Sequence, residues 1–322
     1  MTTRREIVLG LGGLTGMMVM PSFAGIASLT RISGRAFGTR WHVTLPADFD
    51  TPTLGINLRQ ILARIEHSMS PFRADSELSR FNIQPNTACF AISDQLRTVA
   101  TQALKVAQLT DGAFDPGVGP AVHRYGFGPI ASGRPGPYTA FAVSAEGLSK
   151  ANPALSLDLC GIAKGYAVDL LAEHLNTLCT PGFLIEVGGE VYARGTRPDG
   201  SLWRVGIADP LDSGVHSILL LTDMAMATSG DAINAYEIAG RRYSHTIDPA
   251  TGEPIRNNVA SVSVLASTAV EADAFATALL VMGPESGLAY ASANGIPVLY
   301  LLREASGLQT KANPLFKKYG RV

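Results

Sequence analysis

The feature that most constrains the fold is the stretch Leu155–Leu178, where the hydrophobic pattern changes its period. Leucines alternate with polar residues over Leu155–Leu159, which is the two-residue period of a strand with one buried face. Beyond Cys160 and Gly161, apolar residues recur every three or four positions, which is the spacing of a helix. The pattern predicts a strand that turns sharply into a helix.

Lys164 lies in the first turn of this predicted helix, where the positive end of the helix dipole disfavours a cation. An anion held by the backbone N–H groups around Gly161 would explain the lysine. The alternative is an ordinary tight turn with a solvated lysine. The stretch matches neither the P-loop nor the glycine fingerprint of dinucleotide-binding folds, so it does not favour an ordinary nucleotide fold.

Composition excludes some classes of protein. The chain has 322 residues, of which 46% are hydrophobic, enough for one large or two modest domains. Its net charge is −1 and no basic run follows residue 5, which argues against binding to nucleic-acid phosphates. The three cysteines form no CxxC pair, so no zinc site is indicated. Cys89 and Cys179 could pair in an oxidising compartment, and Cys160 is interpreted as a small buried residue of its turn.

Residues 1–27 are predicted to be an export signal. Arg4 and Arg5 precede a glycine-rich apolar run, Leu9–Met20, which is too short for a membrane span. Two arginines before such a run are typical of the twin-arginine route, so we expect a periplasmic protein. The alternatives are the general secretory route and an uncleaved anchor.

The remaining pattern predicts one α+β unit over residues 28–322, because strands and helices are mixed and no repeat or linker divides them. Glycine turns between short strands favour an antiparallel sheet. Helices are expected at 54–65, 93–107, 164–178, 270–282 and 285–294, and strands at 35–45, 183–187, 191–193, 203–207, 217–221, 259–265 and 296–302. Segments 110–120 and 125–137 are too rich in Gly and Pro for regular structure, and their acidic and aromatic residues favour a ligand loop over a plain connector.

Asp273 and Thr277 are the candidate metal ligands. They lie four residues apart and therefore share one face of a predicted helix. Alanine and phenylalanine surround them, a buried carboxylate needs a partner, and this helix offers no cation. Mg²⁺ would satisfy both oxygens. The alternative is an aspartate favoured by the helix dipole, with the threonine hydroxyl bonding back to its own helix.

His245 is the candidate catalytic base. It lies among polar loop residues in Tyr243–Pro254, although a histidine in such a place is often only a structural hydrogen bonder. The chain has neither the GxSxG elbow of serine hydrolases nor the HExxH motif of zinc proteases, so both classes are excluded.

Seven stretches occur together in an order that resembles a known family. They are Ser79–Asn82, Asp111–Pro116, Asp158–Asp169, Glu186–Gly189, Thr228–Asp231, His245–Gly252 and Asp273–Thr277. Together they closely resemble the ApbE-type flavin transferases, which are FAD:protein FMN transferases. The resemblance covers nearly the whole chain after the predicted signal.

The resemblance implies a single two-lobed α+β unit with FAD between the lobes. Such enzymes use FAD and Mg²⁺ outside the cytoplasm and move FMN onto a threonine or serine of an exported or membrane-anchored acceptor protein, releasing AMP. By position, Asp273 and Thr277 match the metal ligands, with the backbone carbonyl of Gly161 as a third. Positions that match FAD contacts are Ala113, Phe114, Asp115, Asp158, Lys164 and the backbone near Ile247. Phe37 and Phe72 fall where the family lines the flavin or adenine site with Met and Tyr.

The chain also departs from the family pattern. Cys160 replaces a usual glycine, Gly117 a usual threonine and Tyr125 a common tryptophan, which bears on ligand affinity more than on the reaction. Segment 232–236 differs too, so contacts with the acceptor are expected to differ. Two alternatives stay open: a pyrophosphatase that hydrolyses FAD to FMN and AMP, and a flavin carrier without turnover.

Overall fold

The computed structural model describes residues 28–212, 214–231, 235–238 and 240–320. The predicted export signal, residues 1–27, lies outside them. Within these ranges, no helix combines the length and apolarity that crossing a membrane requires.

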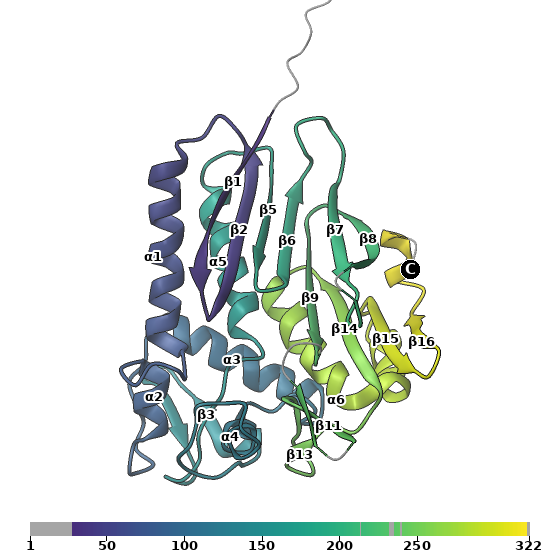
Figure 1. Cartoon of the computed structure of the whole chain (residues 1–322). Coiled ribbons are helices and arrows are strands. Elements are labelled where there is room, and N and C mark those ends of the chain that lie inside the picture. The colour runs from purple at the N-terminus through teal and green to yellow at the C-terminus, as the bar shows by residue number, and fades with distance from the viewer. Residues whose placement is uncertain (1–27, 213, 232–234, 239, 321–322) are drawn as a thin grey trace, which may run out of the picture.

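The fold is built on an eight-stranded antiparallel sheet (Figure 1). Its strand order is β1 (Leu29–Ala36), β2 (Thr39–Pro46), β5 (Gly182–Val187), β6 (Glu190–Gly195), β9 (Met224–Gly230), β14 (Val259–Ala266), β15 (Val298–Glu304) and β16 (Gly307–Ala312). Four two-stranded pairs accompany it: β3 (Phe141–Val143) with β4 (Leu148–Lys150), β7 (Trp203–Ala208) with β8 (Val215–Leu221), β10 (Ala235–Ile238) with β11 (Arg241–Ser244), and β12 (Ile247–Asp248) with β13 (Glu253–Pro254). The antiparallel prediction is confirmed.

The helices are α1 (Thr51–Met69), α2 (Glu77–Asn82), α3 (Asp94–Leu109), α4 (Gly119–Arg124), α5 (Ala163–Asn176) and α6 (Ala269–Ala293), with 3₁₀ turns η1 (Pro116–Val118), η2 (Tyr138–Ala140) and η3 (Phe316–Tyr319). Helices α5 and α6 pack against each other and on one face of the sheet. Strand β15 is buried on both faces: Tyr300 joins the core that includes the helices, whereas Leu299 and Leu301 join a second core with the β7–β8 hairpin. The result is an α+β fold, as predicted.

Two predicted strands are wrong. The single strand expected at 35–45 is a hairpin, because Phe37 (φ 53°) and Gly38 (φ 71°) adopt left-handed conformations and reverse the chain between β1 and β2. Segment 155–159 belongs to no sheet and forms only an isolated bridge between Leu155 and Arg134. The side-chain amide of Asn82 bonds both backbone groups of Leu157, accepting from its N–H at 2.8 Å and donating to its carbonyl oxygen at 2.8 Å. A side chain therefore replaces the partner strand that the pattern implied.

The first glycine- and proline-rich segment, 110–120, is less irregular than predicted, whereas the second, 125–137, contains no helix or strand, as predicted. Residues 116–118 form η1, and α4 begins at Gly119. The Asp115 carboxylate caps η1 by accepting the Gly117 N–H at 2.8 Å. By contrast, the predicted break between the two C-terminal helices is confirmed as a kink in α6 at Gly283 (φ 76°), followed by Pro284.

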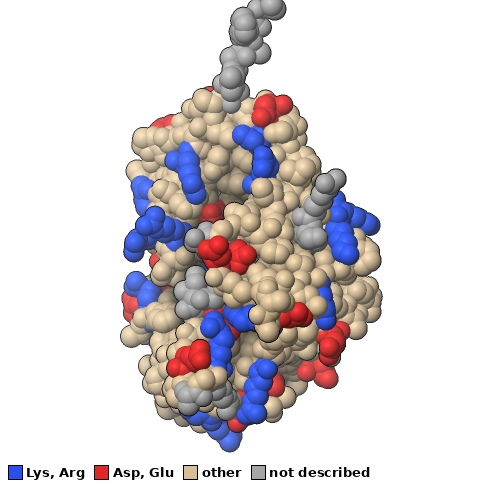
Figure 2. All heavy atoms as spheres, turned by 45° about the vertical axis from the view of Figure 1, so that its right-hand side comes forward, with Lys and Arg blue, Asp and Glu red and all other residues tan. Residues whose placement is uncertain are grey.

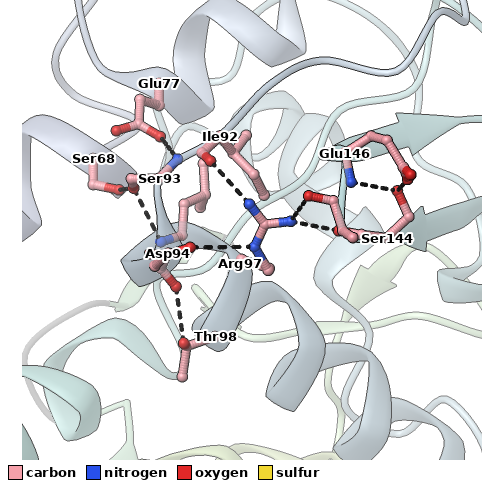
Figure 3. Close-up of polar contacts among 11 residues, drawn as sticks. Ser68, Glu77, Ile92, Ser93, Asp94, Arg97, Thr98, Ser144 and Glu146 are labelled. Carbon is pink, nitrogen blue, oxygen red and sulfur yellow. Dashed lines mark hydrogen bonds and ion pairs between the residues drawn. The ribbon is translucent and has the colours of Figure 1, made fainter.

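A polar network fastens the start of α3 to its neighbours (Figure 3). The Glu77 carboxylate on α2 accepts the Ser93 N–H at 2.7 Å, and the Ser93 hydroxyl caps α3 by accepting the Leu96 N–H at 3.3 Å. Arg97 donates to the Ser144 carbonyl oxygen at 2.6 Å, which ties α3 to the β3–β4 hairpin. These contacts fix the start of α3, and the loop that follows the helix leads to Phe114 and Asp115.

Charge is mixed over the surface. On the face shown in Figure 2, basic and acidic side chains are interspersed and form no broad basic field, which agrees with the net charge of −1. Cys89, Cys160 and Cys179 are free thiols and all three are exposed. The interpretation of Cys160 as a buried residue is therefore wrong, and Cys89 and Cys179 are not bridged.

Candidate active site

The site begins where α5 and α6 come into close contact. A Cβ atom at Gly165 would lie 2.2 Å from the Ala269 carbonyl oxygen, so only glycine permits this approach. The approach lets the Gly165 N–H donate to Asp273 Oδ2 at 2.9 Å. One turn later, the Asp169 carboxylate accepts the N–H groups of Ala269 and Val270 at 2.8 and 2.9 Å. The first two turns of α6 are therefore fixed to α5 by two carboxylates.

Lys164 lies between two buried carboxylates. Its Nζ donates to Glu190 Oε1 at 2.7 Å and lies 3.8 Å from Asp273 Oδ1. The lysine side chain is 28% exposed, whereas each carboxylate side chain is only 3% exposed. The anion that accounts for a lysine in the first turn of α5 is therefore supplied by the protein. Although α6 itself carries no cation near Asp273, α5 provides one, which corrects the premise of the sequence argument.

The charges of this cluster do not balance. Burial raises the pKa of Asp273, with the Lys164 ammonium opposing it, and burial likewise raises the pKa of Glu190. Burial alone would lower the pKa of Lys164, but Asp273 and Glu190 outweigh it and raise that pKa, so the lysine stays charged. When all three are ionised, two negative charges face one positive charge. The raised carboxyl pKa values mean that a proton on Glu190 or Asp273 can supply the missing positive charge, and so can a bound cation.

Thr277 and Gly161 complete an oxygen-rich corner beside Asp273. The Thr277 hydroxyl lies 3.2 Å from the Ser229 hydroxyl on β9. A Cβ atom at Gly161 would lie 3.1 Å from Thr277 Oγ1, so the Gly161 backbone borders the threonine. The structure thus brings the three predicted metal-ligand residues together.

These residues fit a hard divalent ion, because carboxylate, hydroxyl and carbonyl oxygens are the donors that Mg²⁺ accepts. The part of the chain that the structure describes holds no group of three or more His, Cys, Asp or Glu side chains placed to bind a metal. The fit therefore depends on the hydroxyl and carbonyl oxygens in addition to Asp273.

Loop 113–115 adjoins this corner. The Phe114 ring lies 3.2 Å from the Cβ position of Gly161, and Phe114 is buried. Ala113 donates its N–H to the Thr110 carbonyl oxygen at 3.0 Å. The Asp115 carboxylate accepts the N–H groups of Gly117 and Tyr138 at 2.8 and 2.9 Å, so in this structure it organises its own loop. Burial raises the pKa of Asp115.

Asp158 connects that loop to the start of α5. Its N–H donates to the Pro116 carbonyl oxygen at 2.7 Å, and its Oδ1 accepts the Cys160 N–H at 2.9 Å. Burial raises the pKa of the Asp158 carboxyl. A Cβ atom at Gly117 would lie 1.9 Å from the Gly136 carbonyl oxygen, which explains why this chain carries glycine at that position.

The other predicted site residues come from three separate segments. Phe37 is half-buried in the β1–β2 turn, and Phe72, 71% exposed, lies between α1 and α2. Ile247 is buried at the start of β12. His245 is half-buried just before it, with its ring 6.2 Å from that of Phe127 in an edge-to-face arrangement. The contacts described above instead join Phe114 and the start of α5 to Asp273 and Thr277 on α6.

Sequence reasoning missed three contributors. Glu190 follows the Gly188-Gly189 turn, Ser229 lies inside the Thr228–Asp231 stretch, and Gly165 follows Lys164 directly. An acid after a double glycine was the available signal for Glu190. No local pattern shows that Gly165 and Ser229 lie against α6.

This antiparallel sheet, with two helices that pack on it and meet at a buried acid–lysine cluster, has a fold that known proteins share. The profile of the ApbE family matches residues 37–300. The FAD:protein FMN transferase of Vibrio cholerae is 37% identical over 96% of this chain and 98% of its own length. That of Escherichia coli K12 is 32% identical over 93% of this chain and 91% of its own.

Solved structures agree. The flavin transferase ApbE from Vibrio cholerae superposes with a TM-score of 0.83 at 38% identity, covering 91% of this chain and 99% of that one. The apo form of the Pseudomonas stutzeri flavinyl transferase ApbE gives a TM-score of 0.82 at 34% identity, covering 91% and 96%. The chain belongs to the ApbE family. The predicted family, fold class and enzyme class, a transferase, are thereby confirmed.

Proposed function

We propose that this protein is a Mg²⁺-dependent FAD:protein FMN transferase that moves FMN from FAD to a threonine or serine hydroxyl of an exported acceptor protein and releases AMP. One observation carries the proposal: a chain of this family brings Lys164, Asp273, Thr277 and Gly161 together at the start of α5. Relatives over nearly the full length are named FAD:protein FMN transferases.

The charge of each residue at the site determines its proposed role. Asp273, the Thr277 hydroxyl and the Gly161 carbonyl would hold Mg²⁺, which when bound supplies positive charge that stabilises a pyrophosphate under attack. The Lys164 ammonium, which stays protonated, would contact a phosphate oxygen. The backbone N–H groups of Ile162, Ala163 and Gly165 already donate to acceptors within the protein, so the lysine, not these groups, would contact the anion.

The flavin and adenine would be held by Phe37, Phe72, Ala113, Phe114, Asp115, Asp158 and the backbone near Ile247. His245 would accept the proton of the acceptor hydroxyl. The hydroxyl oxygen then forms a bond to the phosphorus of the FMN moiety, the pyrophosphate P–O bond breaks, and AMP leaves with the bridging oxygen.

The test mixes purified protein and FAD with and without Mg²⁺, and with and without a candidate acceptor. AMP is measured by chromatography and protein-bound flavin by in-gel fluorescence. The transferase releases AMP mainly when the acceptor is present, together with a fluorescent acceptor band. AMP release without acceptor would instead favour the pyrophosphatase, and none under any condition would favour the flavin carrier.

A further inference from the structure

Glu190 contains a polar atom that the fold leaves unsatisfied. Glu190 is 2% exposed, and its Oε1 accepts a hydrogen bond from the Lys164 ammonium at 2.7 Å. Its Oε2 is buried and, within the described residues, has no hydrogen-bond partner. A buried carboxylate with one unpaired oxygen is costly, so its retention beside the candidate site calls for an explanation other than stability.

The turn before Glu190 directs the lysine toward it. Gly188 and Gly189 have φ values of 62° and 107°, and the chain then enters β6 with Glu190 as its first residue. Lys164 Cδ lies 3.4 Å from the Cβ position of Gly188, so the lysine stem runs along this turn. This path places the Lys164 ammonium within hydrogen-bonding distance of Glu190 Oε1.

Asp273 lies farther from the ammonium of the same lysine than Glu190 does. Its Oδ2 accepts the Gly165 N–H at 2.9 Å, which leaves Oδ1 as the oxygen that faces Lys164. The separation of 3.8 Å between Nζ and Oδ1 is too long for a hydrogen bond. A shift of the ammonium by about 1 Å would close a direct ion pair, because such pairs form near 2.7–2.9 Å.

We propose that Glu190 is a positioning residue that holds the Lys164 ammonium away from Asp273 Oδ1 and so keeps this oxygen open to the metal. The inference rests on the metal site of the proposed function. Without the charge of Glu190, the flexible lysine would pair with Asp273, the other carboxylate within its reach, and would compete with Mg²⁺ for Oδ1. A purely structural Glu190 would affect folding but not metal affinity in the folded protein.

The experiment is a calorimetric titration of Mg²⁺ into the purified protein without FAD, for wild type, Glu190→Gln and a control, Glu186→Gln. Glutamine keeps the shape and removes the charge. Glu186 is half-buried on the neighbouring strand β5, and the ion pairs of Lys164, with Glu190 and Asp273, do not include it. We expect Glu190→Gln to weaken Mg²⁺ binding by roughly 10- to 100-fold, the usual effect of losing a group that orients a ligand, and Glu186→Gln to leave it unchanged.

Two further measurements separate competition from damage to the fold. The double variant Glu190→Gln with Lys164→Met removes the competitor, so its Mg²⁺ affinity should return at least to the wild-type value. A crystal structure of Glu190→Gln should show Lys164 Nζ within about 3 Å of Asp273 Oδ1, a result that needs no metal. Equal Mg²⁺ affinity in wild type and Glu190→Gln overturns the inference, and so does a double variant as weak as the single one. A wild type that binds no Mg²⁺ overturns the metal site of the proposed function as well.

Discussion

Asp273 shows how far single residues can be interpreted from a sequence. Its four-residue spacing from Thr277 and its apolar neighbours were enough to predict that both face one site. Its two partners, the Gly165 N–H at 2.9 Å and Lys164 at 3.8 Å, lie more than a hundred residues away in the chain. Partners that a fold brings together over such a separation leave no local pattern. The sequence therefore predicted that the two residues share one face of a helix, but not the contacts that surround Asp273.

Ser229 offers the first prediction at this scale. Its hydroxyl lies 3.2 Å from that of Thr277, and we expect it to orient the threonine oxygen. Ser229→Ala should raise the Mg²⁺ concentration needed for half-maximal AMP release by up to about tenfold, because a neutral hydrogen bond contributes about 0.5–1.5 kcal/mol. The measurement is the Mg²⁺ concentration for half-maximal AMP release. A Ser229→Thr variant, which keeps the hydroxyl, is the control, and an unchanged midpoint in Ser229→Ala would remove the serine from this role.

His245 offers the second prediction. If it accepts the proton of the acceptor hydroxyl, His245→Ala should retain FAD binding but lose transfer by roughly 10²–10⁴-fold, the usual range for a lost general base. His67→Ala, at a histidine whose side chain is 58% exposed, should transfer at the wild-type rate. Flavin transfer to an acceptor and FAD affinity are both measured. Near-normal transfer by His245→Ala would mark the histidine as structural.

At the scale of elements, helices were predicted better than strands. Apolar periodicity located α1, α3 and α5, and Gly283-Pro284 located the kink in α6, because these signals act within a few residues. The hairpin at Phe37-Gly38 was missed because a phenylalanine with φ 53° carries no turn signature. Segment 155–159 was missed because a side chain 75 residues away replaces the strand partner.

Asp169 holds the first turn of α6 against α5, and its pKa leads to a prediction about the stability of the protein. Burial raises the pKa of Asp169 to about 6 from 3.8. The folded protein therefore binds this proton more tightly than the unfolded chain does. The contribution of the protonated Asp169 carboxyl to the free energy of unfolding is complete below about pH 4 and is lost as the pH rises through about 6.

Asp169→Asn cannot titrate and loses one acceptor, so it should be less stable than wild type, and the difference should shrink with rising pH. The shrinkage is at most about 3 kcal/mol, from roughly two pKa units at 1.36 kcal/mol each. Urea unfolding at pH 4.5 and 7.5 measures it, with the fully exposed Asp94 changed to Asn as control. A difference that grows with pH would show that the carboxylate is favoured in its ionised form.

At the scale of the whole molecule, the family resemblance predicted more than local pattern did, because ordered motifs carry information about contacts between distant segments. The profile match over residues 37–300 leaves the first residues untouched, so the route of export stays a prediction. Changing both Arg4 and Arg5 to Lys should retain a reporter fusion in the cytoplasm if the twin-arginine route carries the folded protein. The location of the reporter is measured by fractionating cells that express either the wild-type or the variant fusion. Unimpaired export of the variant would support the general secretory route.

The central claim is that Asp273 and Thr277 hold the metal on which transfer depends. Asp273→Ala removes the negative ligand and Thr277→Val removes a neutral oxygen at nearly constant shape. Alanine and valine change helix propensity by only about 0–0.7 kcal/mol. Asp273→Ala also removes the acceptor of the buried Gly165 N–H, so circular dichroism is used to check that both proteins fold before their curves are compared. Excess Mg²⁺ should restore Thr277→Val better than Asp273→Ala, since water can replace a neutral ligand but not a charge.

The measurement that tests this most directly is acceptor-dependent AMP release against Mg²⁺ concentration for wild type and these two variants. We expect a curve displaced to higher Mg²⁺ for Thr277→Val and one that stays near the baseline for Asp273→Ala. Three curves that superimpose would show that the metal does not bind at this helix.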